Sequence, residues 1–416
     1  MNDLKREILE IPIEAFDSPP VSEAWANSPL AMCSDKALIE AAIEIIAAPK
    51  ATAFSSFILH APLALIARAR LLSMIEPVAR DLARRRIAEL AVRYAAAGEA
   101  VAVSEKNFAS VAECSEALFA ALRAGEVETA DAAVSMLAAK LNASELRRAL
   151  VDPVLPLLGA AAHAPILLAA LPWAMQHFEQ AATLLRAPVR YLAAQPNTRL
   201  TWHTRDIFKT QSTMTTPTSD AETRLYETLR APDKVDCDST SIAPTVLGTE
   251  PHCAANADFV HACVTIDFAS AQRAILRAAA LSMLHDDAKH APYGWSHCLT
   301  LPLAALANHD VSNDEGAVIA IAATHVYASR ATSSIAALPA YTKMREYNAD
   351  ARTKSIQTRR ELANYAATHR DEHLVKYTLA CFDAAELDPE ATSLYLSAAS
   401  YLANYWREQD RNTLQT

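Results

Sequence analysis

The scarcity of glycine limits what this chain can fold into more than any other feature of its sequence. Only 6 of its 416 residues are glycine, whereas average usage of roughly 7% would supply about 29. No two of them lie close together in the sequence. A dinucleotide fingerprint, a Walker loop and a nucleophile elbow each need at least two glycines within a few residues. The sequence therefore predicts no flavin, NAD or ATP site of the glycine-rich kind, and it disfavours all-β folds with many turns.

Alanine-rich stretches with apolar residues at helical spacing fill most of the chain and predict an all-α fold. Apolar residues make up 52% of the chain and charged residues 21%, which is typical of a protein with a large core. Capping signals agree with this prediction. Ser110 with Glu113 predicts a helix that opens there and closes at Gly125, while Asp388 and Pro389 predict the start of a C-terminal helix.

Composition divides the chain into segments that we expect to form one large helical bundle with a long irregular insertion. Thr, Ser, Asp and Pro replace alanine within residues 197–255. A long connection of this kind is often a lid or a binding segment, although a plain surface excursion fits the composition equally well. The expected segments are an irregular N-terminal stretch 1–35, a helical half 36–196, the irregular lid or linker 197–255 and a second helical half 256–416.

Charge and cysteine content restrict the partners and the compartment. The formal net charge is −10, and no run of Lys or Arg forms a stripe that could follow phosphates, which disfavours nucleic acid. The seven cysteines contain no Cys-x-x-Cys, so neither a zinc cluster nor a disulfide framework is indicated. The N-terminal MNDLKREILEIPIEAFD lacks the apolar core of a secretory signal. We expect a cytoplasmic protein with no membrane or nucleic-acid partner, and its oligomeric state has no signature in the sequence.

Four histidines lie in stretches that contain no Asp, Glu, Lys or Arg. These are His60 within 51–67, His163 within 153–178, His297 within 291–309 and His325 within 317–329. An uncharged stretch at helical periodicity indicates a buried helix. The longest stretch has the length of a membrane span, but its four prolines, its alanine content and its histidines favour burial inside the protein. We therefore expect several buried imidazoles.

Several buried histidines suggest a metal more strongly than one does. A single buried histidine is usually a core residue whose ring nitrogens bond to a carbonyl or a hydroxyl. A transition metal, however, can satisfy several imidazoles at once, and neutral histidine is its commonest side-chain ligand. The alternative is a helical scaffold that binds a partner, in which buried histidines scatter through the core. The metal hypothesis predicts that His60, His163 and His297 converge.

The stretches around these histidines are similar to one another. His60 and His163 each begin His-Ala-Pro followed by aliphatic residues, and His297 begins HCLTLPLAALA. A further element, HLVKYTLACFDAA, places His373 and Lys376 three residues apart, so that both lie on one face of a helix. Lys376 either points to solvent or lies near the core, where burial would lower its pKa and let the neutral amine form a carbamate with carbon dioxide. A carbamate is an anionic oxygen ligand.

At these residues the chain resembles the questin oxidase-like family, which is known from fungal aromatic polyketide pathways. The resemblance is carried by the order and spread of the helical histidines His60 and His163, the His-x-Leu-Thr-Leu-Pro segment at His297, and the His-x-x-Lys at His373. It covers most of the chain. Members of the family are non-haem iron oxygenases that open a ring of hydroxyanthraquinones, with four histidines and a carboxylated lysine around the iron.

The resemblance implies a site and an activity for this chain. Fe(II) would be held by His60, His163, His297, His373 and carboxylated Lys376, with His325 either replacing His373 or lying in the substrate pocket. The expected activity is an O2-dependent oxidative ring cleavage or a Baeyer-Villiger-type oxidation of a phenolic or quinonoid small molecule. Hydroxylation or another oxidation by the same metal remains an alternative.

Two further groups of residues are candidates for the site. Asp286, Asp287 and His290 could orient a ligand imidazole or transfer protons, or they could form a solvated helix end. Tyr293, Trp295 and, more weakly, Trp173 are candidates for stacking on a planar substrate, although aromatic residues more often pack in a core.

Overall fold

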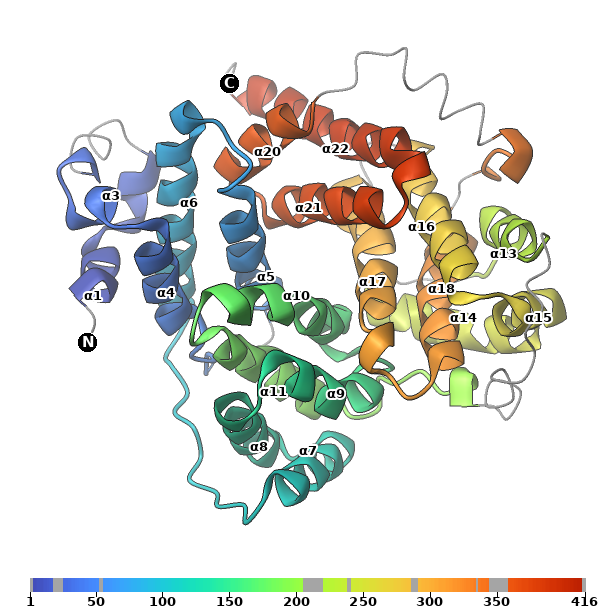
Figure 1. Cartoon of the computed structure of the whole chain (residues 1–416), viewed down its shortest axis with the longest axis horizontal. Coiled ribbons are helices and arrows are strands. Elements are labelled where there is room, and N and C mark those ends of the chain that lie inside the picture. The colour runs from blue at the N-terminus through green and yellow to red at the C-terminus, as the bar shows by residue number, and fades with distance from the viewer. Residues whose placement is uncertain are drawn as a thin grey trace. The chain divides into compact units, whose positions relative to one another are not determined.

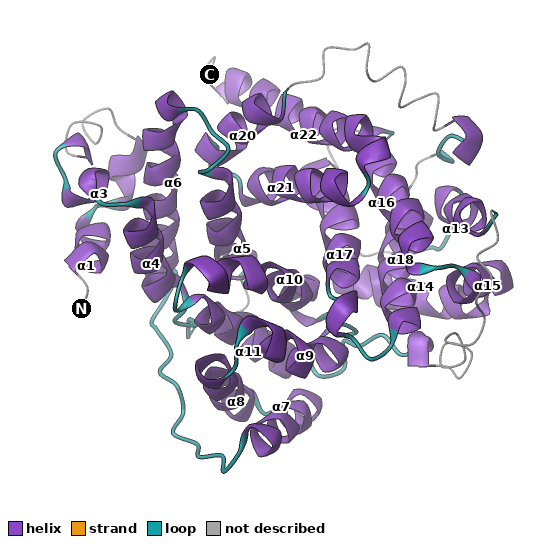
Figure 2. Cartoon of the chain, viewed as in Figure 1, coloured by secondary structure: helices purple, strands orange, loops and turns teal. Residues whose placement is uncertain are grey.

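The computed structural model describes residues 3–17, 25–51, 55–204, 220–237, 241–285, 291–333, 336–343 and 358–413. Within these ranges every regular element is a helix, and extended pairing is limited to two isolated β-bridges (Figure 2). The all-α prediction is confirmed. None of the helices in the described ranges combines the length and the apolarity needed to cross a bilayer.

The residues group into two compact units that interleave along the chain. The first comprises residues 1–153, 166–197 and 363–375, and the second comprises 154–165, 198–362 and 376–416. The divisions at 165 and 375 fall inside two continuous helices, α10 (His163–His177) and α21 (Glu372–Leu387). The four consecutive segments expected from composition stay a prediction.

The first unit is built from helices of the N-terminal half together with the end of α20 (Arg359–Thr368) and the start of α21. In chain order its other elements are α1 (Asp3–Glu10), η1 (Ile13–Asp17), α3 (Pro29–Met32), α4 (Asp35–Ile46), α5 (Ser56–Leu71), α6 (Pro77–Ala96), α7 (Val111–Ala124), α8 (Val127–Lys140), α9 (Ala143–Val154), the greater part of α10, η3 (Ala181–Leu185) and α11 (Arg186–Ala194). Helices α4, α5 and α6 pack on one another, and α8 packs on α7 and α11 (Figure 1).

The second unit is arranged around α16 (Phe268–Leu284), which packs against α13, α17, α18 and α22. The stretch Ala278–Leu281 of α16 consists of three alanines and a leucine and is fully buried, because small side chains let neighbouring helices approach closely. The other elements of this unit are η2 (Gly159–Ala162), η4 (Trp202–Thr204), α13 (Ala221–Arg230), α14 (Ile242–Ala255), α15 (Ala257–Thr265), the π-helix η7 (Ala291–Trp295), α17 (Ser296–Ala307), η8 (His309–Val311), α18 (Glu315–Ala331), η9 (Pro389–Ala391) and α22 (Thr392–Thr413).

The helix predicted after Ser110 forms as expected. The Ser110 hydroxyl accepts a hydrogen bond from the Glu113 N–H at 3.1 Å, and α7 ends at Gly125, which has a left-handed φ of 79°. Such a backbone angle strains any residue with a side chain, so glycine is the natural terminator here. The following helix α8 packs on α7. The predicted helix is therefore confirmed.

Two segments expected to be irregular contain helices. Helix α1 lies within 1–35, and α13 and α14 lie within 197–255. In α13 the buried residues are Ala221, Leu225, Tyr226 and Leu229, which form one apolar stripe at helical spacing. The polar composition of the surrounding segment hides this short amphipathic pattern, and tertiary packing of the stripe decides the structure.

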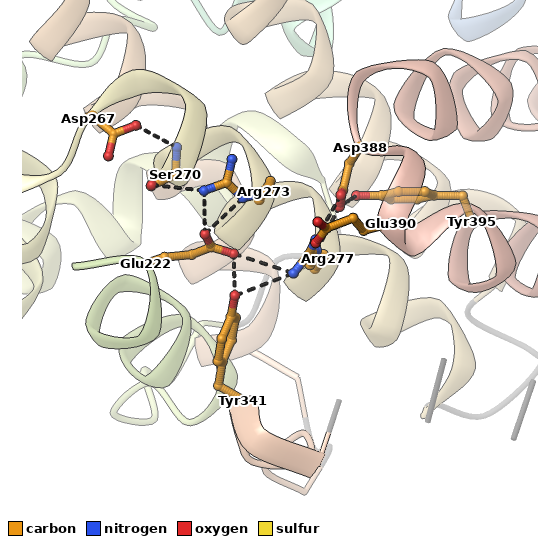
Figure 3. A network of polar contacts seen from close by, with 9 residues as sticks. All are labelled: Glu222, Asp267, Ser270, Arg273, Arg277, Tyr341, Asp388, Glu390 and Tyr395. Atoms are coloured by element: carbon orange, nitrogen blue, oxygen red, sulfur yellow. Dashed lines mark hydrogen bonds and ion pairs between the residues drawn. The ribbon is translucent and has the colours of Figure 1, made fainter. Parts of the chain in front are cut away.

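The C-terminal boundary falls where Asp388 and Pro389 predicted it, but the Asp388 carboxylate makes no capping hydrogen bond. It instead accepts two hydrogen bonds from the Arg277 guanidinium, at 2.6 and 2.7 Å, and a third from the Tyr395 hydroxyl at 3.0 Å. Burial alone would lower the pKa of Arg277, but this pairing outweighs it and raises that pKa. Figure 3 shows Arg277 between Asp388 and the group formed by Glu222 and Tyr341. One buried ion pair thus joins α16 to the junction of α21 and α22.

Buried arginines bond to backbone carbonyls at several helix ends. Arg68 on α5 donates to the carbonyls of Ala367 and His369 at the end of α20, at 2.9 and 2.8 Å. Arg330 on α18 donates to the carbonyls of Leu229 and Arg230 at the end of α13, at 2.9 and 2.8 Å. The last carbonyls of a helix have no partner within the helix, so these guanidinium groups satisfy them in place of a glycine motif.

We predict that Asp388→Asn lowers the free energy of unfolding by about 3 to 5 kcal/mol, because it removes the nearest and most buried carboxylate that pairs with the buried Arg277 charge. The matched control is Glu390→Gln, since the Glu390 side chain is 78% exposed and 3.6 Å from the same guanidinium. This control should change the stability by less than about 0.5 kcal/mol. Urea unfolding followed by circular dichroism measures both, and equal effects of the two substitutions would contradict the prediction.

Candidate metal centre

His60 lies on α5, where the residues of the helix interior are buried. No charged residue occurs between 51 and 67, and the stretch Ile58–Ala67 is buried in the core. Pro62 lies inside this helix two residues after His60, and because proline has no N–H it cannot donate to the Ile58 carbonyl. The helix therefore presents a buried imidazole beside a local gap in its backbone hydrogen bonding.

His163 is the first residue of α10 and is 2% exposed. The two residues before it, Ala161 and Ala162, have left-handed φ angles of 50° and 56°. Residues other than glycine rarely adopt such angles, and each costs on the order of 1 to 3 kcal/mol unless the surroundings enforce it. Backbone strain of this kind clusters at ligand sites. Here it directly precedes the imidazole that the sequence singled out.

His297 lies at the start of α17, directly after the π-helix η7. Its Nδ1 lies 2.7 Å from the Tyr293 carbonyl oxygen, and since a carbonyl can only accept, Nδ1 carries the proton. A neutral ring in this tautomer has its lone pair on Nε2. Single turns of π-helix occur frequently at functional sites, and this one supplies the carbonyl that orients the ring.

The three histidines converge on one point. His60, His163 and His297 are buried, and their ligand nitrogens all lie within 4.8 Å of one another. Two nitrogens on one metal ion stand about 3 to 4 Å apart when each metal–nitrogen bond is about 2.1 Å. The group therefore needs only a small contraction to hold an ion. Convergence of these three residues is what the metal hypothesis predicted.

His373 and Lys376 lie one turn apart on α21. The ring of His373 meets that of His60 edge to face, with centroids 4.3 Å apart, and His163 and His297 form a similar ring contact at 5.4 Å. His373 Nδ1 is 3.7 Å from an Asp371 carboxylate oxygen. Lys376 is half-buried. His373, like His325, does not belong to the convergent group. Its role as a ligand and that of Lys376 stay predictions.

His325 is buried on α18 but does not belong to the convergent group. Burial lowers its pKa to about 4, and its Nδ1 has no hydrogen-bond partner among the residues that the structure describes. A second buried histidine, His203 in η4, was not singled out from the sequence, because it lies in the polar segment TWHTRD. Burial, reinforced by Arg199, lowers the pKa of His203 to about 4. Its only sequence signal is the neighbouring Trp202.

The other candidate residues take varied positions. Asp286, Asp287 and His290 lie outside the described residues. Trp295 is buried, whereas the Tyr293 side chain is 58% exposed, so the contribution of Tyr293 to the site is its carbonyl.

Trp173 is half-buried and stacks on His177, with ring centroids 4.4 Å apart. The Arg70 guanidinium lies 5.9 Å from the centroid of the Trp173 ring.

The donor set fits a transition metal. Imidazole suits iron, zinc, copper and nickel, whereas magnesium and calcium prefer oxygen ligands, and the convergent group offers nitrogen alone. In α17 every residue from Ser296 to Leu306 is buried, so the surroundings of His297 are dry. Three neutral imidazoles in a water-free core carry no positive charge that would repel a bound cation. The group could therefore hold a metal, and its donor chemistry selects a d-block ion.

Comparisons with known proteins add no assignment. No family model, no curated protein and no solved structure matches this chain.

We predict that His325 makes the metal-free protein less stable in mild acid. The pKa of His325 in the folded state is about 4, below its ordinary value of 6.5, so the unfolded state binds more protons between these pH values. Stability should thus fall as the pH drops, by about 2 kcal/mol from this residue between pH 7 and pH 5. His325→Gln should remove that part of the pH dependence, measured by urea unfolding at both pH values.

The matched control is His252→Gln, since His252 is exposed on α14. Its pH dependence of stability should equal that of the wild type. A His325→Gln variant whose stability still falls as steeply as the wild type would refute the assignment.

Proposed function

We propose that this protein is a non-haem iron oxygenase that acts with O2 on a phenolic or quinonoid, polyketide-like small molecule. The observation that carries the proposal is the convergence of His60, His163 and His297 in the buried core. The resemblance of the sequence to the questin oxidase-like family supports the choice of iron and of an aromatic substrate. The proposed reaction is an oxidative ring cleavage or a Baeyer-Villiger-type oxidation.

The proposed ligands are the three convergent imidazoles, His373 and a carbamate formed on Lys376. His373 is supported by its ring contact with His60, and Lys376 by its place one turn further along α21. Carbamate formation joins the Lys376 nitrogen to the carbon of CO2 and releases a proton. One anionic oxygen with four neutral imidazoles would leave a bound Fe(II) with a formal charge of +1.

The surrounding chain would keep the reaction dry and the imidazoles neutral. The buried stretches of α5 and α17 exclude water from His60 and His297, and a low-dielectric environment favours uncharged rings. The Tyr293 carbonyl holds the proton of His297 on Nδ1 and reserves Nε2 for the ion. When bound, iron would supply the one-electron chemistry that lets O2 react with an electron-rich ring.

The donor set also limits how the substrate is held. Five protein ligands would leave a bound iron little room for substrate, so the protein would hold most of the substrate through contacts away from the metal. A buried aromatic residue near His297 is Trp295, which we propose as part of that wall. The chain carries no glycine-rich phosphate loop, so we propose no nicotinamide or flavin partner in such a site.

We predict that protein purified without chelator contains close to one equivalent of a transition metal, with iron the ion that supports activity. His60→Ala and His297→Ala should each lower the metal content at least tenfold, because each removes one of three converging donors. His252→Ala, an exposed histidine on α14, is the control and should keep the wild-type content. Elemental analysis by mass spectrometry provides the measurement, and wild-type protein that holds no metal after reconstitution would refute the proposal.

We further predict oxygen uptake with iron-loaded protein and a phenolic anthraquinone or a related polyketide. The uptake should be lost in His60→Ala and in Lys376→Ala, since the first loses an imidazole and the second the carbamate. Product mass then separates the reactions: ring cleavage by dioxygenation adds two oxygen atoms, whereas hydroxylation or lactone formation adds one. A Lys376→Ala variant with wild-type uptake would remove Lys376 from the ligand set.

A further inference from the structure

The junction between α20 and α21 is fixed by arginines of α5 and α6. In addition to the Arg68 contacts at the end of α20, Arg86 donates to the Thr368 carbonyl at 2.9 Å, and Arg93 pairs with Glu372 at 3.2 Å. The Asp371 N–H donates to Nδ1 of His369 at 3.0 Å. These contacts hold the residues on both sides of Asp371 in place. They therefore also fix the position from which the Asp371 side chain extends.

Asp371 has two oxygens with different neighbours. Its Oδ1 accepts a hydrogen bond from the Leu374 N–H at 2.9 Å, which is the usual contact of a helix N-cap. Its Oδ2 lies 3.7 Å from Nδ1 of His373. One carboxylate therefore caps α21 and faces the imidazole two residues later.

We propose that Asp371 is a positioning residue of the metal site: its Oδ2 accepts the Nδ1 proton of His373 and so reserves Nε2 of His373 for the ion. The inference rests on the proposed function, in which His373 is a ligand. Metal-bound histidines usually donate their other ring proton to a carboxylate or a carbonyl, and this fixes both the tautomer and the ring orientation. The Tyr293 carbonyl does the same for His297.

The contact must shorten by about 1 Å to reach the length of a charge-assisted hydrogen bond. An ion on Nε2 withdraws electrons from the ring and makes the Nδ1 proton a better donor, which favours this closure. His60, whose ring meets that of His373 edge to face, would limit rotation of His373 from the other side. The carboxylate and the neighbouring ring together would hold a single ring orientation.

Two substitutions separate capping from positioning, because Asn and Ser both replace Asp well at an N-cap. In Asp371→Asn the amide oxygen must face the Leu374 N–H, so the amide NH2 faces His373. That NH2 can only donate, which places the lone pair of His373 on Nδ1 and its proton on Nε2, where it blocks the ion. In Asp371→Ser the acceptor is lost but the tautomer is not reversed. Metal affinity should therefore fall in the order wild type, Asp371→Ser, Asp371→Asn.

The test is a titration of the full-length, metal-free protein with Co²⁺, followed by its visible absorption and by competition with a chelator. Loss of such a hydrogen-bond partner typically costs about 10-fold to 100-fold in metal affinity. We expect a loss in this range for Asp371→Asn and a smaller loss for Asp371→Ser. The matched control is Asp267→Asn, because Asp267 caps α16 through an identical 2.9 Å contact with the Ser270 N–H and is likewise half-buried. This control should bind Co²⁺ like the wild type.

Each outcome has one meaning. If both Asp371 variants bind Co²⁺ as tightly as the wild type, or if both fail to fold, Asp371 is a structural cap and the inference is overturned while the proposed function stands. If the wild type itself binds no Co²⁺, the proposed metal site fails and this inference fails with it. Equal losses in the Asp267 and Asp371 variants would also overturn it, because the effect would then come from weakened capping.

Discussion

The bonding of guanidinium groups to the ends of buried helices is the interaction on which this structure depends. A chain with six glycines has few residues that can end a helix in the left-handed conformation, and Gly125 is one of them. Elsewhere Arg68 and Arg330 reach across from a neighbouring helix and take up the last carbonyls. Burying a charge is costly, but a guanidinium that makes several hydrogen bonds recovers much of that cost. The end of one helix is thereby tied to the side of another.

This way of ending helices also places the chemistry. Arg68 lies on the same helix as His60, and the carbonyls to which it bonds lie just before His373. Both histidines are thus located by one set of contacts within the first unit, and their rings meet at 4.3 Å. In the second unit, His297 is oriented by a carbonyl of the adjoining π-helix. The imidazoles are positioned by backbone groups whose own places are fixed by packing.

The sequence predicted burial well and contacts poorly. Uncharged stretches at helical period marked His60, His163, His297 and His325 as core residues, and all four are less than a tenth exposed. This rule works because an unpaired charge is rarely buried. Its converse fails for Arg68 and Arg277, which are buried because partners distant in sequence satisfy them. Those partners cannot be read from spacing along one helix.

The same limit applies to the site. Local sequence could not show that His325 stands outside the convergent group, nor that His203 is buried, because both depend on how helices far apart in the chain pack. Asp388 illustrates a different failure. The capping pattern at Asp388 predicted the helix boundary correctly, but its carboxylate pairs with Arg277 and does not cap the helix. The buried guanidinium competes for this carboxylate more strongly than an exposed backbone N–H does. Short-range rules locate element boundaries, and long-range electrostatics assigns the side chains.

The turn before His163 has a consequence for how an ion would be captured. Glycines in place of Ala161 and Ala162 would adopt the same left-handed angles without strain, but they would also leave the turn many other shapes in its unbound form. Alanine prefers right-handed and extended conformations, so the packing around this turn must enforce its left-handed angles. If the packing keeps that shape in the absence of an ion, an ion that bound His163 would require little further ordering of the backbone.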